Sequence, residues 1–293
     1  MKYLTMQTGS ALVMALMLLS MLAISTIAAD QHGMYPELSI GNTLPEITGM
    51  AVAQASYDPI ESSNTTITIY MNVTDVNGVA DLDDSKAYVY LDDVATFVTA
   101  VGKYTRLCSP LANHSATIRE YQCDTDLEFY DSAGTYSSNM TAGDSNGTVW
   151  NNTATNAPTF TYTTLVASTV GDSAVNFNGV TLGTVNAPAV NNPTIVTNTG
   201  NALLQMNVTG ADMVGQVYAE TIGIGNFSVS LDGTPSAEMV LTTGTQQIVV
   251  GGTNSTAPAG ASSTENLYWY VDVPATLQPD TYNATWTLGT YEL

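Results

Sequence analysis

Strand-like segments recur along this chain at short intervals, with tight-turn signals between them. The turn signals are Asn77-Gly78, Asn146-Gly147, Asn178-Gly179 and Asp232-Gly233, and such pairs are typical of short β-hairpin loops. No convincing amphipathic helix follows the first thirty residues, and the abundant Thr, Val and Tyr favour strands. The pattern therefore predicts an all-β protein of the sandwich type.

The length of 293 residues leaves room for two ordinary domains after an N-terminal segment. We expect one sandwich over residues 42–166 and a second over residues 167–293. Seven strands, the number of an immunoglobulin-like sandwich, are expected in the first: 47–56, 66–74, 86–91, 96–101, 126–130, 135–142 and 159–165. Those expected in the second are 175–177, 194–197, 202–208, 226–231, 238–241, 246–250, 267–273 and 282–288. Residues 251–264 are predicted to form a flexible loop. They are not expected to be a domain linker, because strong strand signals follow them.

Residues 1–29 have the pattern of a signal peptide. Lys2 precedes an apolar run over residues 11–24, and small residues lead to Ala28 and Ala29. Cleavage after Ala28 or Ala29 would make the protein secreted, at the extracellular cell surface. An uncleaved membrane anchor and a pilin-type leader remain as alternatives. No second apolar run of membrane length follows, so no membrane span is expected in the mature chain.

Residues 30–41 are predicted to form an extended N-terminal arm. Met34, Leu38 and Ile40 share one parity, and alternation of this kind is typical of a half-buried strand. Three fates stay open for the arm: insertion at the sheet edge of a neighbouring subunit, pairing with its own sheet, or disorder. Pro36 is compatible with an added edge strand if its nitrogen faces away from the partner strand.

The charge balance restricts the partners of the protein. The net charge is −21 although only 11% of residues are charged, because five Lys and Arg stand against 26 Asp and Glu. Nucleic-acid binding needs basic side chains that displace counterions, so it is excluded, and acidic lipid surfaces are disfavoured for the same reason. Metal cations are the natural counter-charge.

Two cysteines, Cys108 and Cys123, stand fifteen residues apart. In an exported chain an even pair predicts one disulfide, with two free thiols as the alternative. The mostly polar residues 106–124 predict an exposed loop beside a strand.

The sequence also predicts N-linked glycans. Five of the sequons fall in predicted strands, and in each of these the asparagine has the parity opposite to its apolar neighbours, which predicts an outward side chain. Ten asparagines stand in N-x-S/T sequons: Asn64, Asn72, Asn113, Asn139, Asn146, Asn151, Asn207, Asn226, Asn254 and Asn283.

An acidic segment is the candidate metal site. Asp75, Asn77, Asp81, Asp83 and Asp84 fall within ten residues around a glycine turn, and calcium takes six to eight such oxygen ligands. The spacing is not that of an EF-hand. A solvated loop whose Asp and Asn residues form turns is the alternative.

Two further surface features, an acidic group and two pairs of tyrosines, each have a functional and a purely structural interpretation. Asp124, Asp126 and Glu128 would share one strand face, where they either attract a cation or are simply exposed. Tyr88 and Tyr90 lie on the face opposite Val89, and Tyr268 and Tyr270 lie on the face opposite Trp269. Such tyrosines either make protein or sugar contacts or are ordinary outward side chains.

The sequence does not predict an enzyme. Residues 143–147 (GDSNG) fit the G-x-S-x-G pattern, but the mechanism needs a strand-to-helix elbow and a downstream histidine. No helix signal follows, and the histidines beyond the signal peptide are His32 and His114. A polar hairpin turn is the predicted structure of this segment, and no catalytic residue is expected.

Several segments resemble archaeal cell-surface proteins. Residues 74–82 (TDVNGVADL) resemble a turn of immunoglobulin-like domains, and residues 130–141 (YDSAGTYSSNMT) resemble the D-x-G-x-Y corner of PKD-like sandwiches. Residues 197–208 and 273–288 resemble strands of sandwich modules on archaeal envelopes. The resemblance implies a buried corner Tyr136 whose hydroxyl bonds nearby backbone.

The role that this resemblance implies is a structural subunit of an S-layer, sheath or filament that polymerises with copies of itself. An adhesive module that binds a glycan or a protein is the alternative. Fold alone does not choose between these roles.

Overall fold

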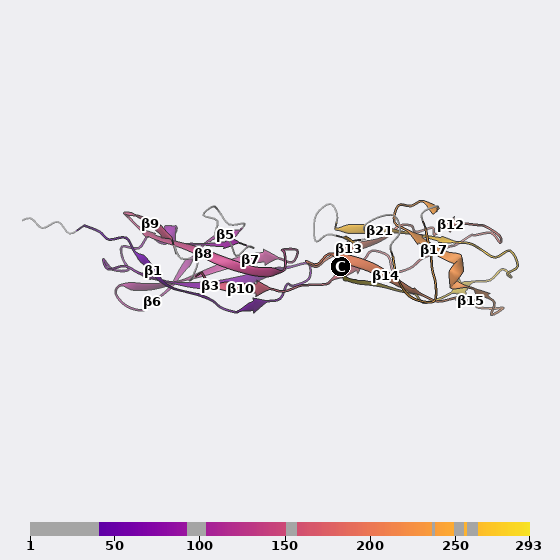
Figure 1. Cartoon of the computed structure of the whole chain (residues 1–293), viewed down its shortest axis with the longest axis horizontal. Coiled ribbons are helices and arrows are strands. Elements are labelled where there is room, and N and C mark those ends of the chain that lie inside the picture. The colour runs from indigo at the N-terminus through magenta and orange to yellow at the C-terminus, as the bar shows by residue number, and fades with distance from the viewer. Residues whose placement is uncertain (1–40, 93–103, 151–156, 236–237, 249–254, 257–262) are drawn as a thin grey trace, which may run out of the picture. The chain divides into compact units, whose positions relative to one another are not determined.

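The computed structural model describes residues 41–92, 104–150, 157–235, 238–248, 255–256 and 263–293, and these form an all-β structure (Figure 1). Two short 3₁₀ turns, η1 (Asp84–Lys86) and η2 (Ile224–Asn226), interrupt the strands. Asn42–Leu293 form one compact unit. Among the described residues, no helix is long and apolar enough to cross a membrane. The predicted signal peptide, the arm residues Met34, Leu38 and Ile40, and the predicted strand 96–101 lie outside the described residues.

The first half of the chain forms two sheets. Sheet one has the order β1 (Glu46–Val52), β3 (Asn64–Thr74), β7 (Ile118–Glu128) and β6 (Ser109–Asn113). Sheet two has the order β2 (Ser56–Tyr57), β10 (Thr159–Tyr162), β8 (Gly134–Asp144), β4 (Tyr88–Asp92) and β5 (Tyr104–Leu107), and β9 (Gly147–Trp150) pairs with β8. The central ladder of sheet one is the antiparallel pair β3–β7, which runs without a register shift from Asn64↔Glu128 to Thr74↔Ile118.

Alternation along β3 builds the first hydrophobic core. Its inward residues Ile67, Ile69, Met71 and Val73 are each 0% exposed, as the sequence parity predicts. Burial of each such side chain stabilises the fold by about 1.5–3 kcal/mol relative to an exposed one. Sheet two contributes Val89, Leu91 and Met140, among others, to the same cluster.

The predicted corner tyrosine has the predicted contacts. The Tyr136 ring is buried and stacks on Phe160, with ring centroids 5.5 Å apart. Its hydroxyl donates to the Ser132 carbonyl at 2.9 Å. Asp131, also buried, accepts from the Glu128 N–H at 2.7 Å and from the Tyr104 hydroxyl. The resemblance therefore predicted the contacts of this corner correctly.

The second half of the chain forms three sheets around a separate hydrophobic cluster that includes Phe227, Val229, Leu267 and Trp269. The two clusters lie on opposite sides, in sequence, of the predicted boundary at residues 166–167, and the number of independent domains stays a prediction. The largest sheet has the order β11 (Ser168–Val170), β13 (Thr194–Asn198), β21 (Thr264–Val271), β17 (Phe227–Ser230) and β18 (Met239–Val240), with β12 (Ala187–Pro188) paired to β21. The second contains β19 (Gly244–Gln247), β14 (Leu204–Gly210), β20 (Ser255–Thr256) and β23 (Thr287–Glu292), and the third contains β16 (Thr221–Ile222), β15 (Met213–Gly215) and β22 (Tyr282–Asn283).

The segment after β13 holds the connection between the two halves of the sequence. The Asn201 side chain accepts from the Leu165 N–H at 2.6 Å and donates to the Thr163 carbonyl at 2.9 Å. Gly200 fits tightly here, because a Cβ at this position would lie 2.1 Å from the Leu165 carbonyl oxygen. Residues 198–201 (NTGN) therefore fix the backbone of the connecting segment.

Several predicted strands are wrong. The predicted strand 126–130 is only the tail of β7, and the predicted exposed loop 106–124 contains β6 and most of β7. Buried residues alternate with polar ones along β7, so the polar composition masked a central strand. Residues 175–177 form no strand, and the predicted loop 251–264 includes β20 and the first residue of β21. In place of seven strands, the described part of the first half contains β1–β10.

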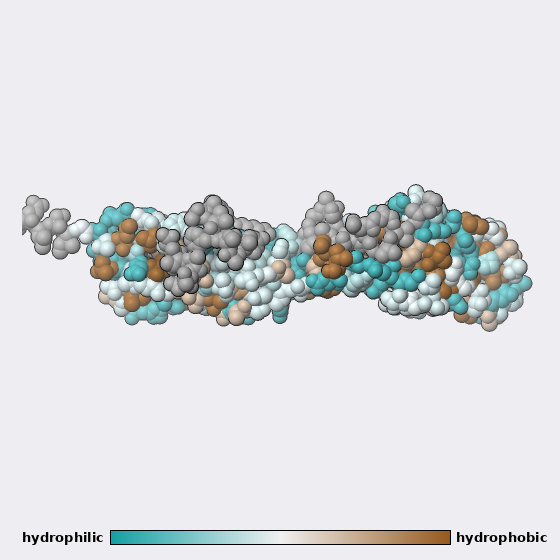
Figure 2. All heavy atoms as spheres, viewed as in Figure 1, coloured by the Kyte–Doolittle hydropathy of each residue, from teal (hydrophilic) through white to brown (hydrophobic). Residues whose placement is uncertain are grey.

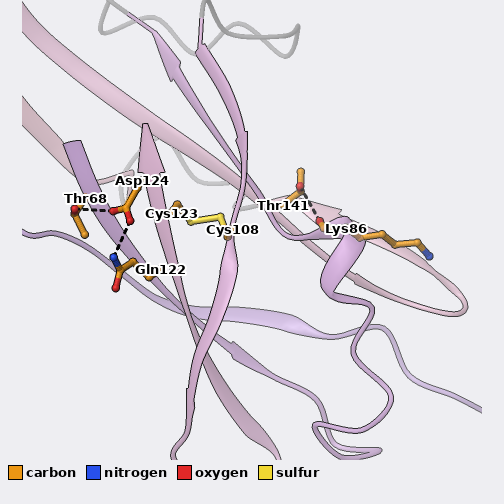
Figure 3. Close-up of a disulfide and its surroundings, with 7 residues drawn as sticks. All are labelled: Thr68, Lys86, Cys108, Gln122, Cys123, Asp124 and Thr141. Atoms are coloured by element: carbon orange, nitrogen blue, oxygen red, sulfur yellow. Dashed lines mark hydrogen bonds between the residues drawn. A yellow bond between two sulfur atoms is a disulfide. The ribbon is translucent and has the colours of Figure 1, made fainter. Parts of the chain in front are cut away.

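The predicted disulfide is present. Cys108 and Cys123 are bonded, and both are buried (Figure 3). Cys123 lies on β7 of sheet one, while Cys108 lies between β5 and β6 and donates its N–H to the Ala87 carbonyl at 2.8 Å. The bond therefore fixes the point where the chain passes from sheet two to sheet one.

Removal of this disulfide is expected to destabilise the protein. Replacement of both residues (Cys108→Ala with Cys123→Ala) should lower the free energy of unfolding by about 3 kcal/mol, because the cross-link closes a loop of about fifteen residues in the unfolded chain. Urea denaturation of the oxidised protein and the double variant measures the difference. Equal midpoints would contradict the prediction.

A methyl group at Gly200 should also destabilise the fold, because it meets fixed backbone rather than a flexible side chain. We expect Gly200→Ala to lower the free energy of unfolding by about 1–3 kcal/mol. Gly225→Ala is the matched control, since a Cβ there meets nothing within 4 Å. Equal urea midpoints for the two variants would show that the connecting segment adjusts freely.

Candidate metal centre

Two aspartates of one loop meet a third aspartate from a distant part of the sequence at one end of the first core. Asp75 directly follows β3, Asp81 lies in the turn beyond it, and Asp144 is the last residue of β8. Each offers one carboxylate oxygen, and these oxygens lie within 4.8 Å of one another. Asp75 and Asp144 are each 0% exposed, and Asp81 is half-buried.

Local turns hold two of the carboxylates in place. Asp75 Oδ1 accepts from the Asn77 N–H at 2.7 Å. Asp144 Oδ1 accepts from the N–H groups of Asn146 and Gly147 at 2.7 and 3.0 Å. In both residues one oxygen organises the following turn, which leaves the second oxygen for other contacts.

The loop that carries Asp75 and Asp81 is tied to neighbouring backbone. The Asp75 N–H donates to the Thr117 carbonyl at 2.8 Å, and the Asp83 N–H donates to the Gly143 carbonyl at 2.9 Å. Gly78 has a φ of +109° at the turn, a conformation that glycine adopts without strain. These bonds bring the loop alongside the end of β8.

Asn42 closes the group from the N-terminal side. Its Nδ2 donates to Asp144 Oδ2 at 3.1 Å, while its carbonyl accepts from Asn146 Nδ2 at 3.4 Å. The next residue, Thr43, donates its N–H to Asn77 Oδ1 at 2.9 Å. Residues 42 and 43 are thus bonded both to the loop that carries Asp75 and Asp81 and to the β8–β9 hairpin.

The electrostatics of this group are unfavourable without a counter-charge. Within the described part of the chain, none of the three carboxylates forms an ion pair with Lys, Arg or His. Two like charges at this separation repel by about 3 kcal/mol at an effective dielectric constant of about 20. Lys86 is the basic residue that contacts this group, and its ammonium donates to the Asp144 backbone carbonyl rather than to a carboxylate of the three.

The structure corrects the predicted ligand set. Asp75 and Asp81 belong to the group, but Asp83 and Asp84 do not. Asp83 accepts from the Ser85 hydroxyl and N–H, which lowers the pKa of the Asp83 carboxyl below its ordinary value. Its position at the start of η1 makes it the cap of that turn.

Asp84 belongs to a different cluster. It accepts from Arg119 Nη1 and from the Tyr121 hydroxyl, each at 2.7 Å. Burial and this contact with Asp84 raise the pKa of Tyr121 above its ordinary value. The carboxylate is therefore already neutralised, and it has no need of a metal ion.

Sequence reasoning missed Asp144 and Asn42. Asp144 stands in the GDSNG segment, which the structure forms as the predicted hairpin between β8 and β9. It lies more than sixty positions from Asp81 in the sequence, and long-range contacts such as the pairing of Leu82 with Asp144 bring the two loops together. No local pattern reports such a contact.

The second acidic group is an ordinary outward strand face. Asp124 accepts from the Thr68 hydroxyl at 2.7 Å and from Gln122 Nε2 at 2.8 Å (Figure 3). Asp126 accepts from the Thr66 hydroxyl at 2.7 Å. The alternation predicted for Asp124, Asp126 and Glu128 is confirmed. Hydroxyl and amide groups donate hydrogen bonds to Asp124, and a hydroxyl donates to Asp126.

The sequons differ in exposure. Asn64, Asn113, Asn146 and Asn283 are exposed, whereas Asn72, Asn207 and Asn226 are half-buried. Glycines stand opposite two of the half-buried residues, Gly49 against Asn72 and Gly289 against Asn207. Asn151 and Asn254 lie outside the described residues.

Asn139 contradicts the predicted outward placement. It is 5% exposed, and its Oδ1 has no hydrogen-bond partner in the structure. Tyr90 stands directly opposite it on β4, so large aromatic side chains share its face of sheet two. The parity was predicted correctly, but that face is covered.

Aromatic side chains group on the outer face of sheet two. The Tyr90 ring lies 4.9 Å from Trp150 and 6.3 Å from Tyr88, and Trp150 is 43% exposed. We call Tyr88, Tyr90 and Trp150 the aromatic platform. The other predicted pair differs, because Tyr270 is buried and its hydroxyl donates to the Gly233 carbonyl at 2.7 Å. Both faces of the central strand β21 are covered near its C-terminal end.

Comparisons with known proteins add little. No protein-family model matches the chain, and no curated protein matches it. One similar solved structure is that of the C-terminal domain of the Streptococcus pyogenes antigen I/II-family protein AspA. The match has 11% identity, covers 78% of this chain and 91% of that chain, and has a TM-score of 0.23. Similarity at this level carries no argument about function.

The exposure pattern predicts which sequons carry glycans. In the secreted protein we expect glycans on Asn64, Asn113, Asn146 and Asn283, and none on Asn139, because a glycan needs a solvent-exposed attachment point. Glycopeptide mass spectrometry of protein from its native cells measures occupancy at each position. A glycan on Asn139 would contradict the described packing of sheet two.

Proposed function

We propose that this protein is a structural subunit of an extracellular surface assembly of the S-layer, sheath or filament type. In this proposal, the secreted, N-glycosylated chain consists of two tandem immunoglobulin-like sandwiches and polymerises with copies of itself. It is not an enzyme, and it belongs with the archaeal surface proteins that its corner and turn motifs resemble.

The observation that carries this proposal is the burial of the group Asp75, Asp81 and Asp144, the candidate metal site found among the described residues. Asp75 and Asp144 are fully buried, whereas a catalytic or ligand-binding carboxylate must reach its substrate. A buried group of carboxylates is suited to stabilise the fold rather than to act on a substrate. A rigid, stabilised β-structure is what a load-bearing surface subunit requires.

The disulfide and the sequons support the location. A buried disulfide is typical of proteins that fold in an oxidising compartment. Seven of the eight sequon asparagines in the described residues are exposed or half-buried, and they occur in both halves of the sequence. Apolar residues form scattered spots on the face drawn in Figure 2, which suits a surface in contact with water.

The edges of sheet one are poor sites for uncontrolled strand addition. Both edge strands carry a register shift, in β1 between Ile47 and Gly49 and in β6 between Pro110 and Ala112. Bulges and edge prolines protect sheets from pairing with other chains. Assembly would then avoid the edges of sheet one, and the predicted arm is the first candidate for a strand donated to a different sheet edge of a neighbour.

The aromatic platform supports a second candidate function, that of an adhesive module. Exposed aromatic rings stack on sugar faces and serve as anchors in protein interfaces. Trp150 is the most exposed ring of the platform. A glycan or a protein on a partner cell would be its ligand.

One set of experiments separates the two functions. The secreted protein, purified with its disulfide intact, should form ordered polymers in negative-stain electron microscopy. A variant that lacks Asp30–Ile40 should stay folded by circular dichroism yet fail to polymerise, if the arm links subunits. Trp150→Ala should polymerise normally. A monodisperse monomer that binds glycans or cells, and loses that binding on Trp150→Ala, would overturn the structural proposal in favour of adhesion.

A further inference from the structure

We propose that Asp75, Asp81 and Asp144, together with Asn42, bind one calcium ion that joins the entry of the chain to two loops of the first core. The inference rests on the geometry of these four residues and does not depend on the proposed function. It also replaces the ligand set that the local sequence pattern predicts, because it takes Asp144 and Asn42 in place of Asn77, Asp83 and Asp84.

Buried oxygens without partners point to a ligand at this place. Asp75 Oδ2, Asp81 Oδ2 and Asn42 Oδ1 are each buried and have no hydrogen-bond partner in the structure. Asp75 is 0% exposed, so water does not reach its second oxygen from outside. A buried oxygen without a hydrogen-bond partner lowers the stability of the fold. Three such oxygens in one group therefore point to a bound cation.

The chemistry of the group selects a hard divalent cation. All the available atoms are carboxylate or amide oxygens, which are the ligands that calcium takes in proteins. Two ligands on opposite sides of a calcium ion, each about 2.4 Å from it, are about 4.8 Å apart. The carboxylate oxygens lie within 4.8 Å of one another, which is compatible with three ligands of one ion. Backbone oxygens and waters would complete the coordination.

The turns around the group orient the second carboxylate oxygens of Asp75 and Asp144, of which Asp75 Oδ2 is unpartnered and Asp144 Oδ2 accepts from Asn42 Nδ2. The Asp75 and Asp144 Oδ1 atoms are held by N–H donors of residues 77, 146 and 147. These bonds orient each side chain so that coordination needs no new turn conformation. Calcium tolerates irregular geometry of this kind better than Mg²⁺, which needs near-ideal octahedral ligands at shorter distances.

The ion would act as a clamp on the segment Asn42–Leu44. This segment already bonds to Asn77 through the Thr43 N–H and to Asp144 through Asn42. With an ion bound to Asn42, Asp81 and Asp144, the three pieces of chain could separate only if the ion were released. Calcium therefore controls how firmly the segment Asn42–Leu44 is attached to the first core.

The test uses the full secreted chain with its disulfide intact. After treatment with a chelator, the protein is dialysed against calcium, with or without excess magnesium, and its metal content is measured. We expect one calcium per chain, retained in the presence of magnesium, and a higher Tm in calcium than in chelator. Hydrogen exchange of the Thr43 amide should slow when calcium is added.

The variants Asp75→Asn and Asp144→Asn test the assignment, because the new amide oxygen can still accept from the turn N–H groups. Each should weaken calcium binding by at least about tenfold, since fewer charged ligands lower affinity, and each should lose the calcium-dependent rise in Tm. In chelator they should melt at or above the Tm of the unchanged protein, because like-charge repulsion is relieved. Asp83→Asn is the matched control, and it should bind calcium normally.

Three results would overturn the proposal. They are the absence of bound calcium in the unchanged protein, equal calcium affinity in Asp75→Asn or Asp144→Asn, and loss of binding in Asp83→Asn. Displacement of calcium by an equal concentration of magnesium would overturn the choice of ion. The direct measurement on the unchanged protein keeps the test decisive even if a variant fails to fold.

Discussion

A shortage of basic side chains dictates how this protein satisfies its carboxylates. Five Lys and Arg serve 26 Asp and Glu, so most of these groups must find neutral donors. Asp280 accepts from the backbone N–H groups of Val217 and Tyr218 at 2.8 and 3.0 Å, and Asp126 accepts from the Thr66 hydroxyl at 2.7 Å. Hydrogen bonds that include a charged partner are stronger than neutral ones. Aspartates therefore organise several loops of the fold, and some of them fix the turn that follows.

This arrangement sets the acid stability of the turns. The hydroxyl of Ser230, followed by donors of Thr234, lowers the pKa of Asp232 to about 2. A carboxyl whose pKa is lower in the folded than in the unfolded state stabilises the fold above its ordinary pKa of 3.8, and the contribution is lost as the pH falls toward 2. Hydrogen bonds lower the pKa of Asp83, Asp172 and Asp280 in the same direction. The turns thus keep their charges well into the acid range mainly through hydrogen bonds, with one ion pair, from Lys86 to Asp83, among these four.

The sequence predicted those parts of the fold that local alternation and turn chemistry determine. The four inward residues of β3, the hairpin around Asn146-Gly147 and the contacts of Tyr136 follow from periodicity or from a short motif. By contrast, β7 carries polar residues on its outward face around the disulfide cysteine, and this composition imitates a loop. Two aspartates of the candidate site could be named from the sequence, since they share one turn. Asp144 could not, because a long-range strand pairing brings it there, and the buried Asn139 likewise depends on what covers its sheet.

Salt should act on this protein through two separate effects. With a net charge of −21, general repulsion destabilises the compact state, and any salt relieves it by screening. Hydrogen bonds between aspartates and adjacent N–H or hydroxyl donors act at contact distance, so screening affects them little. The group of Asp75, Asp81 and Asp144 differs from both, because two of its carboxylates are buried, the third is half-buried, and neutral donors satisfy only part of it. If the proposed calcium ion binds there, divalent cations stabilise this fold by a route that ionic strength alone does not supply.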